Sequence, residues 1–389
     1  MSTFAPESHT STIVSIMISS HPTRAVINLN AFRHNISVIK KYIGGKVGII
    51  AVVKANAYGH GMEIITKEAV SSGVACLGVA RITEAVELRK TGFSIPILLF
   101  EIIPRNFEEQ GIIYSVDLTI ATMDDAQRIE SVAERVRRKA NVHIDVDTGM
   151  GRLGHDWKGA ADFVERVAMM KWLHPVAVYS HFATSEDPDQ TFAREQLRRF
   201  HTVIEELDKR RIEIPMEHMA NSGAIISLPE SHFDLVRPGI MMVGYPPRRG
   251  MDDSQLKPVM TLLAKVSLLK KVPQGMSISY GRRYSAPADT HIATVPIGYG
   301  DGYSRMLTGK AEVLIRGKRY PVVGAITMDH LMVDVGCDSE VEEGDDVVLM
   351  GTSGGESISL WDIADRLGTI PYEVLCMVAD RVPRVAVTS

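Results

Sequence analysis

The sequence contains few cysteines. Only Cys76, Cys337 and Cys376 occur among 389 residues, and no two of them form a CxxC pair. An odd number of widely separated cysteines indicates neither a disulfide framework nor a structural zinc site. A reducing compartment is therefore expected.

Long apolar runs and early basic residues are also missing. No apolar run approaches the ~20 residues of a membrane-spanning helix, and IVSIMI at 13–18 has about a third of that length. The first 22 residues contain no Lys or Arg, so the basic start of a secretory signal is absent. Residues 1–22 are interpreted as a partly ordered tail on a cytoplasmic protein without a membrane partner.

A strong charge of one sign is absent as well. The formal net charge is −4, and the basic clusters at 135–139 and 209–211 have the pattern of solvated helix faces. These features argue against a nucleic-acid partner. Hydrophobic residues make up 45% and charged residues 23% of the chain, so a large core can form.

The length suggests two domains. A proline-rich, charged segment at 245–258 is suited to a linker between them. The expected organisation is a tail at 1–22, a first domain at 23–247 and a second domain at 248–389, with residues 23–30 as a candidate strand of the second domain.

Short apolar runs alternate with longer amphipathic stretches throughout the first domain. Eight such units with continuous apolar runs predict a closed (β/α)8 barrel of the TIM type, because such strands are buried on both faces. A doubly wound open sheet fits the periodicity nearly as well. The predicted strands are 47–54, 74–80, 95–100, 117–121, 141–147, 175–181, 216–220 and 235–241.

The second domain is predicted to be mostly β. Five strand-like segments lie between turn residues, and one helix interrupts them from Ser359. Ser359 and Asp362 form a capping box at the start of this helix, and Gly368 stands at its end.

Polar side chains follow the predicted barrel strands, whose carboxyl ends meet at the mouth where such barrels have their active sites. Lys54 ends the first run after seven residues without a charge. A lysine desolvated at such a mouth can form a Schiff base with a carbonyl, whereas a lone lysine is more often a solvated surface charge. The other candidates are Tyr58, Asp145, Asp147, Arg152, His181, Asn221, Ser222, Arg237 and Gly239.

Two further segments suit a phosphate. ANSGA at 220–224 and RPGI at 237–240 offer a serine hydroxyl and backbone N–H groups near glycine. Each alone is also a common turn.

Nine segments in both domains carry a more specific pattern: AVVKANAYGHG (51–61), DTGMGRLG (147–154), SHFATSED (180–187), HMANSGA (218–224), RPGI (237–240), SISYGRRY (277–284), PIGYGDGY (296–303), TMD (327–329) and PYEVLC (371–376). Together and in this order they resemble the alanine racemase family. The resemblance implies a barrel with a C-terminal mostly-β domain, the cofactor pyridoxal 5'-phosphate, and a homodimer with shared active sites. D-alanine from such an enzyme most often feeds peptidoglycan.

The resemblance also implies catalytic roles. Lys54 is expected to carry the cofactor covalently and to act as base on one face of the alanine Cα, while Tyr280 of the partner subunit acts on the other. His181 and Arg237 match the residues that couple this tyrosine towards the cofactor. Arg237 also matches the residue facing the pyridine nitrogen, where a guanidinium keeps its proton and disfavours transamination.

Binding contacts follow from the same resemblance. Gly239 and Ile240 are expected to meet the cofactor phosphate through their backbone N–H groups. The expected substrate contacts are Arg152, the backbone N–H of the partner's Met328, and Tyr299. The complete set of expected cofactor contacts is Lys54, Tyr58, Arg152, His181, Asn221, Ser222, Arg237, Gly239, Ile240 and Tyr372, and no metal ligand is expected.

The sequence departs from the family at two positions. Asp145 stands where many members have a lysine, often carbamylated, and it is interpreted as an anion of shorter reach that orients Arg152 without carbon dioxide. The alternative is that Asp145 is an acidic residue that faces away from Arg152. Thr327 replaces a cysteine of many members, so lower sensitivity to cysteine-directed inhibitors is expected.

Other functions remain open at this stage. Zinc-assisted lyases of this fold need a His-x-Cys-like pair, but a valine stands two residues before each cysteine. Decarboxylases of basic amino acids have no use for the tyrosine of SISYGRRY. A cofactor-binding protein without turnover and a racemase of broader specificity, acting on serine for example, are the remaining alternatives.

Overall fold

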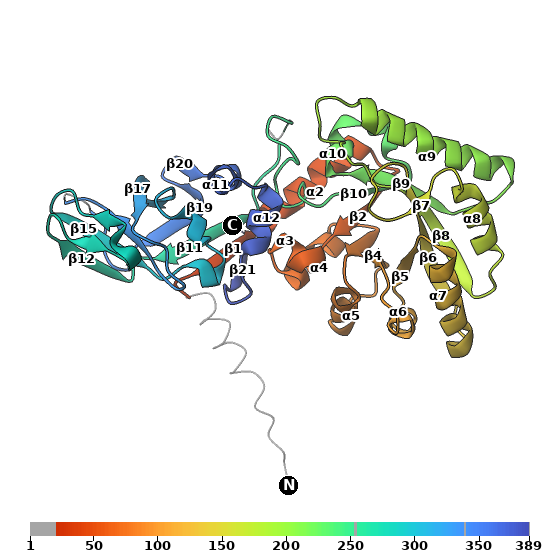
Figure 1. Ribbon diagram of the computed structural model, residues 1–389, viewed down its shortest axis with the longest axis horizontal. Coiled ribbons are helices and arrows are strands. Elements are labelled where there is room, and N and C mark those ends of the chain that lie inside the picture. The colour runs from red at the N-terminus through yellow and green to blue at the C-terminus, as the bar shows by residue number, and fades with distance from the viewer. Residues whose placement is uncertain (1–20, 253–254, 338–339, 389) are drawn as a thin grey trace, which may run out of the picture. The chain divides into compact units, whose positions relative to one another are not determined.

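The computed structural model describes residues 21–252, 255–337 and 340–388, so nearly all of the tail expected at 1–22 lies outside the described residues (Figure 1). The chain divides into two compact units. The first, called the barrel unit, consists of Ala31–Tyr58 and Met62–Lys257. The second, called the strand-rich unit, consists of the described residues up to Asn30, Gly59–Gly61, and the described residues from Pro258 on.

The barrel unit contains a closed ring of eight parallel strands. The β5–β6 and β10–β2 pairings complete the ring, which confirms the predicted barrel and excludes the open sheet. All eight strands overlap predicted runs, although β10 ends four residues before the predicted run 235–241 does. They are β2 (Gly48–Val52), β3 (Cys76–Val79), β4 (Ile97–Ile102), β5 (Asp117–Ile120), β6 (Ala140–Asp147), β8 (Leu173–Tyr179), β9 (Met216–Asn221) and β10 (Leu235–Arg237), and the two-residue β7 (His155–Asp156) pairs with β6.

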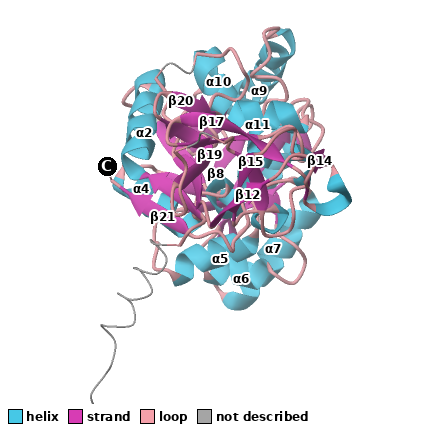
Figure 2. Ribbon diagram, turned by 90° about the vertical axis from the view of Figure 1, so that its left-hand side faces the viewer, coloured by secondary structure: helices cyan, strands magenta, loops and turns pink. Residues whose placement is uncertain are grey.

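Helices cover the outside of the barrel. In Figure 2 the cyan helices α2, α4, α5, α6, α7 and α9 lie towards the rim of the view, outside the magenta strands. Enclosure by helices buries both faces of the strands, so Ile49, Ile50 and Ala51 of β2 are at most 2% exposed. Burying each such isoleucine stabilises the fold by roughly 1.5–3 kcal/mol. The helices are α2 (Leu29–Ile43), α3 (Lys54–Tyr58), α4 (Met62–Ser71), α5 (Ile82–Lys90), α6 (Glu108–Ile113), α7 (Met123–Val136), α8 (Ala160–Ala168), α9 (Thr191–Lys209) and α10 (Ser222–Ser227).

The strand-rich unit is built on a mostly antiparallel sheet. Its main path has the order β12-β15-β18-β17-β16-β19-β11-β1-β21. Strand β1 (Arg24–Asn28), from the red end of the chain in Figure 1, pairs with β11 and β21 of this unit. The other strands are β11 (Met260–Lys265), β12 (Leu268–Val272), β13 (Ser277–Ile278), β14 (Tyr284–Ser285), β15 (Thr290–Val295), β16 (Glu312–Ile315), β17 (Lys318–Val323), β18 (Leu331–Asp334), β19 (Asp346–Ser353), β20 (Glu356–Ile358) and β21 (Arg384–Val387).

One helix of this unit was predicted correctly and one was missed. Helix α11 (Leu360–Leu367) begins with the expected capping box, in which Ser359 Oγ accepts from Asp362 N at 3.1 Å, and ends at Gly368 with φ of 72°. The prediction of a single helix is wrong, because α12 (Pro371–Met377) follows directly. With seven residues, α12 is too short for a helical period to stand out in the sequence.

Candidate active site

The carboxyl ends of the barrel strands bring most of the predicted residues together. Lys54 follows β2, His181 follows β8, and Arg237 ends β10. The Nη2 atom of Arg237 lies 3.1 Å from His181 Nδ1. Burial, together with the positive charges of Arg237, Arg152 and Lys54, holds the pKa of His181 well below its usual range. His181 is therefore neutral at physiological pH. The positive charges of Arg237, Arg152 and Lys54 lie close enough to lower its pKa electrostatically.

The chain turns after Lys54 in an unusual conformation. Ala55, Asn56, Ala57 and Tyr58 have φ angles between 52° and 54°, which is the left-handed helical region. Each non-glycine residue costs roughly 1–2 kcal/mol in this region. Strain of this kind persists only where surrounding contacts hold it, and it is concentrated at functional sites. The left-handed turn therefore makes the adjacent Lys54 a candidate functional residue.

Hydrogen bonds from three sides hold the left-handed turn. The amide of Ala57 donates to Val53 O at 2.9 Å, closing one turn of backbone. The side chain of Asn56 accepts from Met62 N at 2.7 Å, which fixes the start of α4. The amide of Ala55 donates to a carboxylate oxygen of Glu84 at 2.7 Å. The first two contacts are local, whereas the third comes from a different strand–helix unit.

Arg237 lies at the centre of a buried hydrogen-bond network and is 4% exposed. Its guanidinium donates to the carbonyl oxygens of Ser180 at 2.6 Å and Met219 at 2.9 Å, and contacts His218 Nδ1 at 2.5 Å. Burial lowers the pKa of Arg237 to about 10. The value is below that of an ordinary arginine, but Arg237 stays protonated at neutral pH.

The donors of Arg237 determine which ring nitrogen carries the proton in two histidines. Because a guanidinium only donates, His218 Nδ1 accepts and its proton is on Nε2. This Nε2 faces His143 Nδ1 at 3.0 Å, so His143 accepts there and carries its proton on Nε2. The ring of Tyr179 stacks on His218 with centroids 4.7 Å apart, and its hydroxyl pairs with Thr119 at 3.1 Å. The barrel interior below Arg237 is therefore an ordered polar network.

A second set of polar groups forms a small cradle at β9, α10 and β10. The hydroxyl of Ser222 accepts from Gly239 N at 3.0 Å, and the side chain of Asn221 accepts from Ala224 N at 3.0 Å. A Cβ atom on Gly239 would lie 2.3 Å from the Tyr58 hydroxyl, so a larger residue there would have to displace the Tyr58 ring. Hydroxyls and backbone N–H groups are donors that can bind a phosphate. The cradle therefore fits a phosphate group.

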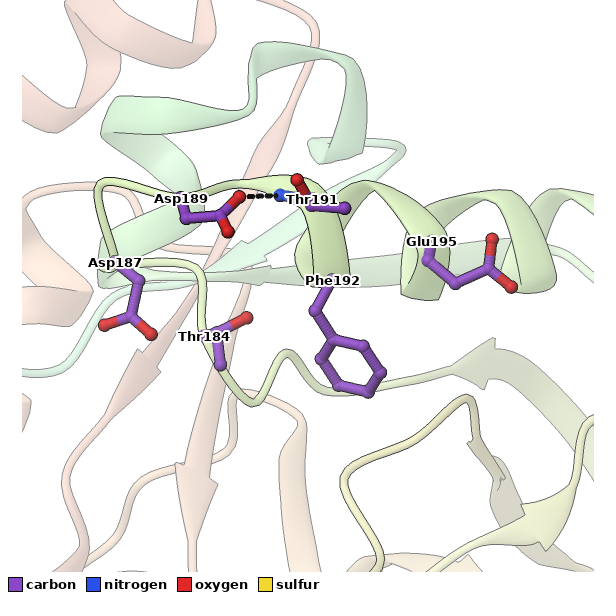
Figure 3. A pocket seen from close by; sticks show the side chains of 6 residues that line it. All are labelled: Thr184, Asp187, Asp189, Thr191, Phe192 and Glu195. Atoms are coloured by element: carbon purple, nitrogen blue, oxygen red, sulfur yellow. Dashed lines mark hydrogen bonds between the residues drawn. The ribbon is translucent and has the colours of Figure 1, made fainter.

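A pocket elsewhere on the barrel unit does not fit an anion. It has a volume of about 420 Å³ and is lined by Thr184, Asp187, Asp189, Phe192 and Glu195, together with Thr191 (Figure 3). Asp189 accepts from Thr191 N at 2.9 Å and so begins α9. Three carboxylates make the lining negative, which repels a phosphate.

The loop that carries Arg152 is shaped by Asp147. The carboxylate of Asp147 accepts from Gly149 N at 2.8 Å and Gly151 N at 3.1 Å. Gly154 has φ of 103°, and a Cβ atom there would lie 2.6 Å from Asp147 N. Arg152 itself is exposed at the surface of the barrel unit. An exposed arginine on a constrained loop can receive a carboxylate in bidentate fashion.

The remaining predicted residues belong to the strand-rich unit. Tyr280 begins the short helix η2 (Tyr280–Arg282) and is 73% exposed. Met328 is 53% and Tyr299 43% exposed, whereas Tyr372 on α12 is half-buried. The hydroxyl of Thr327 donates to His330 O at 2.9 Å and accepts from His330 N at 3.0 Å, which closes the turn that carries Met328.

The fold agrees with comparisons to known proteins. Models of the alanine racemase N-terminal and C-terminal domains match residues 27–247 and 259–386. An alanine racemase from Desulforamulus reducens is 44% identical over 368 residues, which cover 94% of this chain and 98% of that protein. The chain belongs to the alanine racemase family. The solved alanine racemase of Clostridium difficile 630 has a TM-score of 0.91 at 35% identity, and the match covers 95% of this chain and 97% of that one.

Alanine racemases depend on pyridoxal phosphate. The structure of one from Bartonella henselae has it covalently bound; it is 28% identical, with a TM-score of 0.84 over 94% of this chain and 99% of that one. In the present chain, the Ser222–Gly239 cradle fits the phosphate of this cofactor, and Lys54 offers the amine that a covalent link needs. Among the described residues, no group of three or more His, Cys, Asp or Glu side chains is placed to hold a metal ion.

The buried carboxyl of Asp145 gives a testable pH dependence. Burial raises its pKa from 3.8 to about 7, although Arg237 and Arg152 act in the opposite direction. Between these pH values the folded chain keeps a proton that the unfolded chain has lost, so this group's contribution to stability falls as the pH rises from about 4 to about 7. We expect Asp145→Asn to remove that slope, which is at most roughly 1.4 kcal/mol per pH unit.

Denaturant unfolding of both proteins at several pH values in this range measures the slope. Asp145→Asn should gain stability relative to wild type as the pH rises. Parallel stability curves for the two proteins would show that Asp145 ionises normally.

The polar barrel interior was missed from the sequence. His143, His218, Tyr179 and Thr119 all lie within predicted strands and are at most 4% exposed. A signal was present, because His143 stands two residues before Asp145 and so shares its face of β6.

No described helix combines the length and the apolar character that spanning a membrane requires.

Proposed function

We propose that this chain interconverts L-alanine and D-alanine by a two-base mechanism, with Lys54 on one face of the substrate Cα and the partner subunit's Tyr280 on the other. The observation that carries the proposal is the environment of Arg237. Four acceptors orient its guanidinium, which stays protonated at neutral pH. We assign Arg237 to the pyridine nitrogen of the cofactor, where a group that keeps its proton disfavours transamination and leaves racemisation.

Proton transfer at Cα is assigned to two groups. Pyridoxal phosphate, when bound, withdraws electrons from the amino acid and so acidifies its Cα proton. Lys54 removes or returns this proton on its own face. One base alone would mainly return the proton to the face from which it came, so inversion needs a second group on the opposite face. We assign the second proton transfer to the partner subunit's Tyr280. His181, which is neutral, and Arg237, which is protonated, link this tyrosine towards the cofactor.

A homodimer with shared sites follows from the second base. Tyr280, Met328 and Tyr299 expose large side chains on the strand-rich unit, and Met306 is 63% exposed on the same unit. Exposed aromatic and methionine side chains are typical of surfaces that a protein partner covers. We therefore propose that this surface faces the barrel unit of a second copy.

The substrate contacts are assigned to both subunits. Arg152 receives the alanine carboxylate together with the backbone N–H of the partner's Met328, and Tyr299 lies on the substrate side. Tyr372 limits the volume available to the substrate side chain, which favours alanine. A pocket of this kind excludes the hydroxyl of serine only weakly. We propose that the enzyme works in the cytoplasm and supplies D-alanine for peptidoglycan.

Racemisation in deuterium oxide tests the proposed function. The purified holoenzyme is incubated with L-alanine or D-alanine, and optical rotation and Cα deuteration are followed together. We expect both enantiomers to lose rotation at rates that match deuterium entry, with serine slower. A protein that binds the cofactor but does not exchange the Cα proton of alanine would overturn the proposal. Parallel incubations with serine, lysine and arginine would then identify a different substrate.

A further inference from the structure

We propose that Glu84 is a positioning residue for the reaction, because its carboxylate holds the left-handed turn that aims Lys54 into the barrel mouth. The inference rests on the proposed role of Lys54. Glu84 does not touch the substrate or the cofactor in this proposal, and it acts only through the backbone of Ala55.

The contacts of Glu84 join two neighbouring strand–helix units. Glu84 is the third residue of α5, and its Oε2 atom accepts from Ala80 N and Arg81 N, both at 2.9 Å. Its Oε1 atom accepts from Ala55 N at 2.7 Å. One half-buried carboxylate therefore fixes the start of α5 and, with its other oxygen, the first amide after Lys54.

The hydrogen bond to Ala55 falls where the backbone needs support. Ala55 has φ of 52° and ψ of 53° and is the first of four strained residues. A residue with a Cβ atom leaves this region when its contacts are lost, because the left-handed region is unfavourable for it. Loss of the Glu84 contact would let the Lys54–Ala55 peptide rotate, and that rotation would change the direction in which the lysine side chain leaves the backbone.

A second capping residue of the barrel makes local contacts. Asp125 has the same position in α7 that Glu84 has in α5, and it accepts from Thr122 N at 3.0 Å and from Thr122 Oγ1 at 2.7 Å. Its other hydrogen bonds go to Ala121 and Arg128, beside and within the same helix. Asp125→Asn therefore weakens a helix start without touching the Lys54 turn, which makes it the matched control.

The experiment compares Glu84→Gln with Asp125→Asn in the holoenzyme. Glutamine keeps the shape of glutamate but has one acceptor oxygen, so it cannot serve both sides. We expect Glu84→Gln to lower kcat at least about tenfold and to reduce the fraction of cofactor that borohydride traps on Lys54. Asp125→Asn should leave both quantities unchanged. Glu84→Ala should act in the same direction, and far-UV circular dichroism reports whether each variant is folded.

A rescue variant separates positioning from helix capping. Glycine adopts φ near 52° without the Cβ penalty, so Ala55→Gly should restore most of the kcat that Glu84→Gln loses. If Glu84→Gln lowered kcat only by weakening the start of α5, Ala55→Gly would not restore kcat. Unchanged kcat in Glu84→Gln, an equal loss in Asp125→Asn, or no recovery in the double variant would each overturn the proposal.

The failure of the proposed function can be told apart from the failure of this inference. If borohydride traps no cofactor on Lys54 of the wild-type protein, the assigned role of Lys54 is wrong. Hydrogen exchange at the Ala55 amide then still tests the contact, because Glu84→Gln should speed it whereas Asp125→Asn should not. Equal exchange in both variants would show that Glu84 does not hold the turn.

Discussion

Replacing Lys54 with alanine is expected to abolish racemisation, with kcat falling by more than about a thousandfold. The variant loses both the amine proposed to carry the cofactor and the base on one face of Cα. The absorbance of the cofactor–lysine link should disappear, and deuterium should no longer enter alanine from that face. Absorbance spectra, borohydride trapping followed by mass spectrometry, and Cα exchange measure these changes.

Two controls make this result specific. Lys40→Ala removes a lysine of α2 whose Nζ donates to Ser72 O at 2.7 Å, and it should leave activity and absorbance unchanged. Added methylamine should restore part of the exchange in Lys54→Ala, because a small amine can fill the space of the missing side chain and act as a base. Full activity in Lys54→Ala would contradict the assignment and place the cofactor amine elsewhere.

Tyr280→Phe is expected to have the second largest effect, a loss of roughly a hundredfold or more in racemisation with cofactor binding retained. Phenylalanine keeps the ring and removes the hydroxyl that transfers the proton. Lys54 remains, so deuterium should still enter the alanine of one enantiomer without inversion. Comparing deuterium entry with loss of optical rotation, for each enantiomer separately, measures this one-sided exchange. Equal loss of exchange from both enantiomers would show that Tyr280 is not the base of a single face.

Mixing the two inactive proteins tests whether the site is shared. Lys54→Ala subunits still have Tyr280, and Tyr280→Phe subunits still have Lys54. In a mixed dimer one site would combine an intact Lys54 with the partner's Tyr280, so activity should recover to about a quarter of wild type after random exchange of subunits. If each subunit used its own tyrosine, no intact site could form and the mixture would remain inactive.

The barrel was readable from the sequence because its strands are locally encoded. Continuous apolar runs such as GIIAV at Gly48–Val52 have no polar face, as burial by helices demands, and all eight strands were found. The capping box of Ser359 and Asp362 was equally local. Helix α12 was missed because seven residues give no clear period.

The candidate site was readable only in part. Lys54, His181 and Arg237 stand at strand ends, and a barrel brings strand ends together, so their proximity could be expected before the fold was known. The contacts between His143, His218 and Arg237 could not be derived in the same way. His143 and His218 are 75 positions apart, and His218 and Arg237 are 19 positions apart. Whether they meet depends on the register of the strands across the barrel interior.

The sequence by itself determined the family, the succession of strands and helices, and the identities of the polar groups at the strand ends, because these depend on residue types within short segments. Only the tertiary structure decided the left-handed turn after Lys54 and its support by Glu84. Four non-glycine residues do not adopt positive φ on their own, since that conformation is unfavourable for each of them. It is held here by a carboxylate 29 residues further along the chain, which only the neighbouring barrel strand brings within hydrogen-bonding distance.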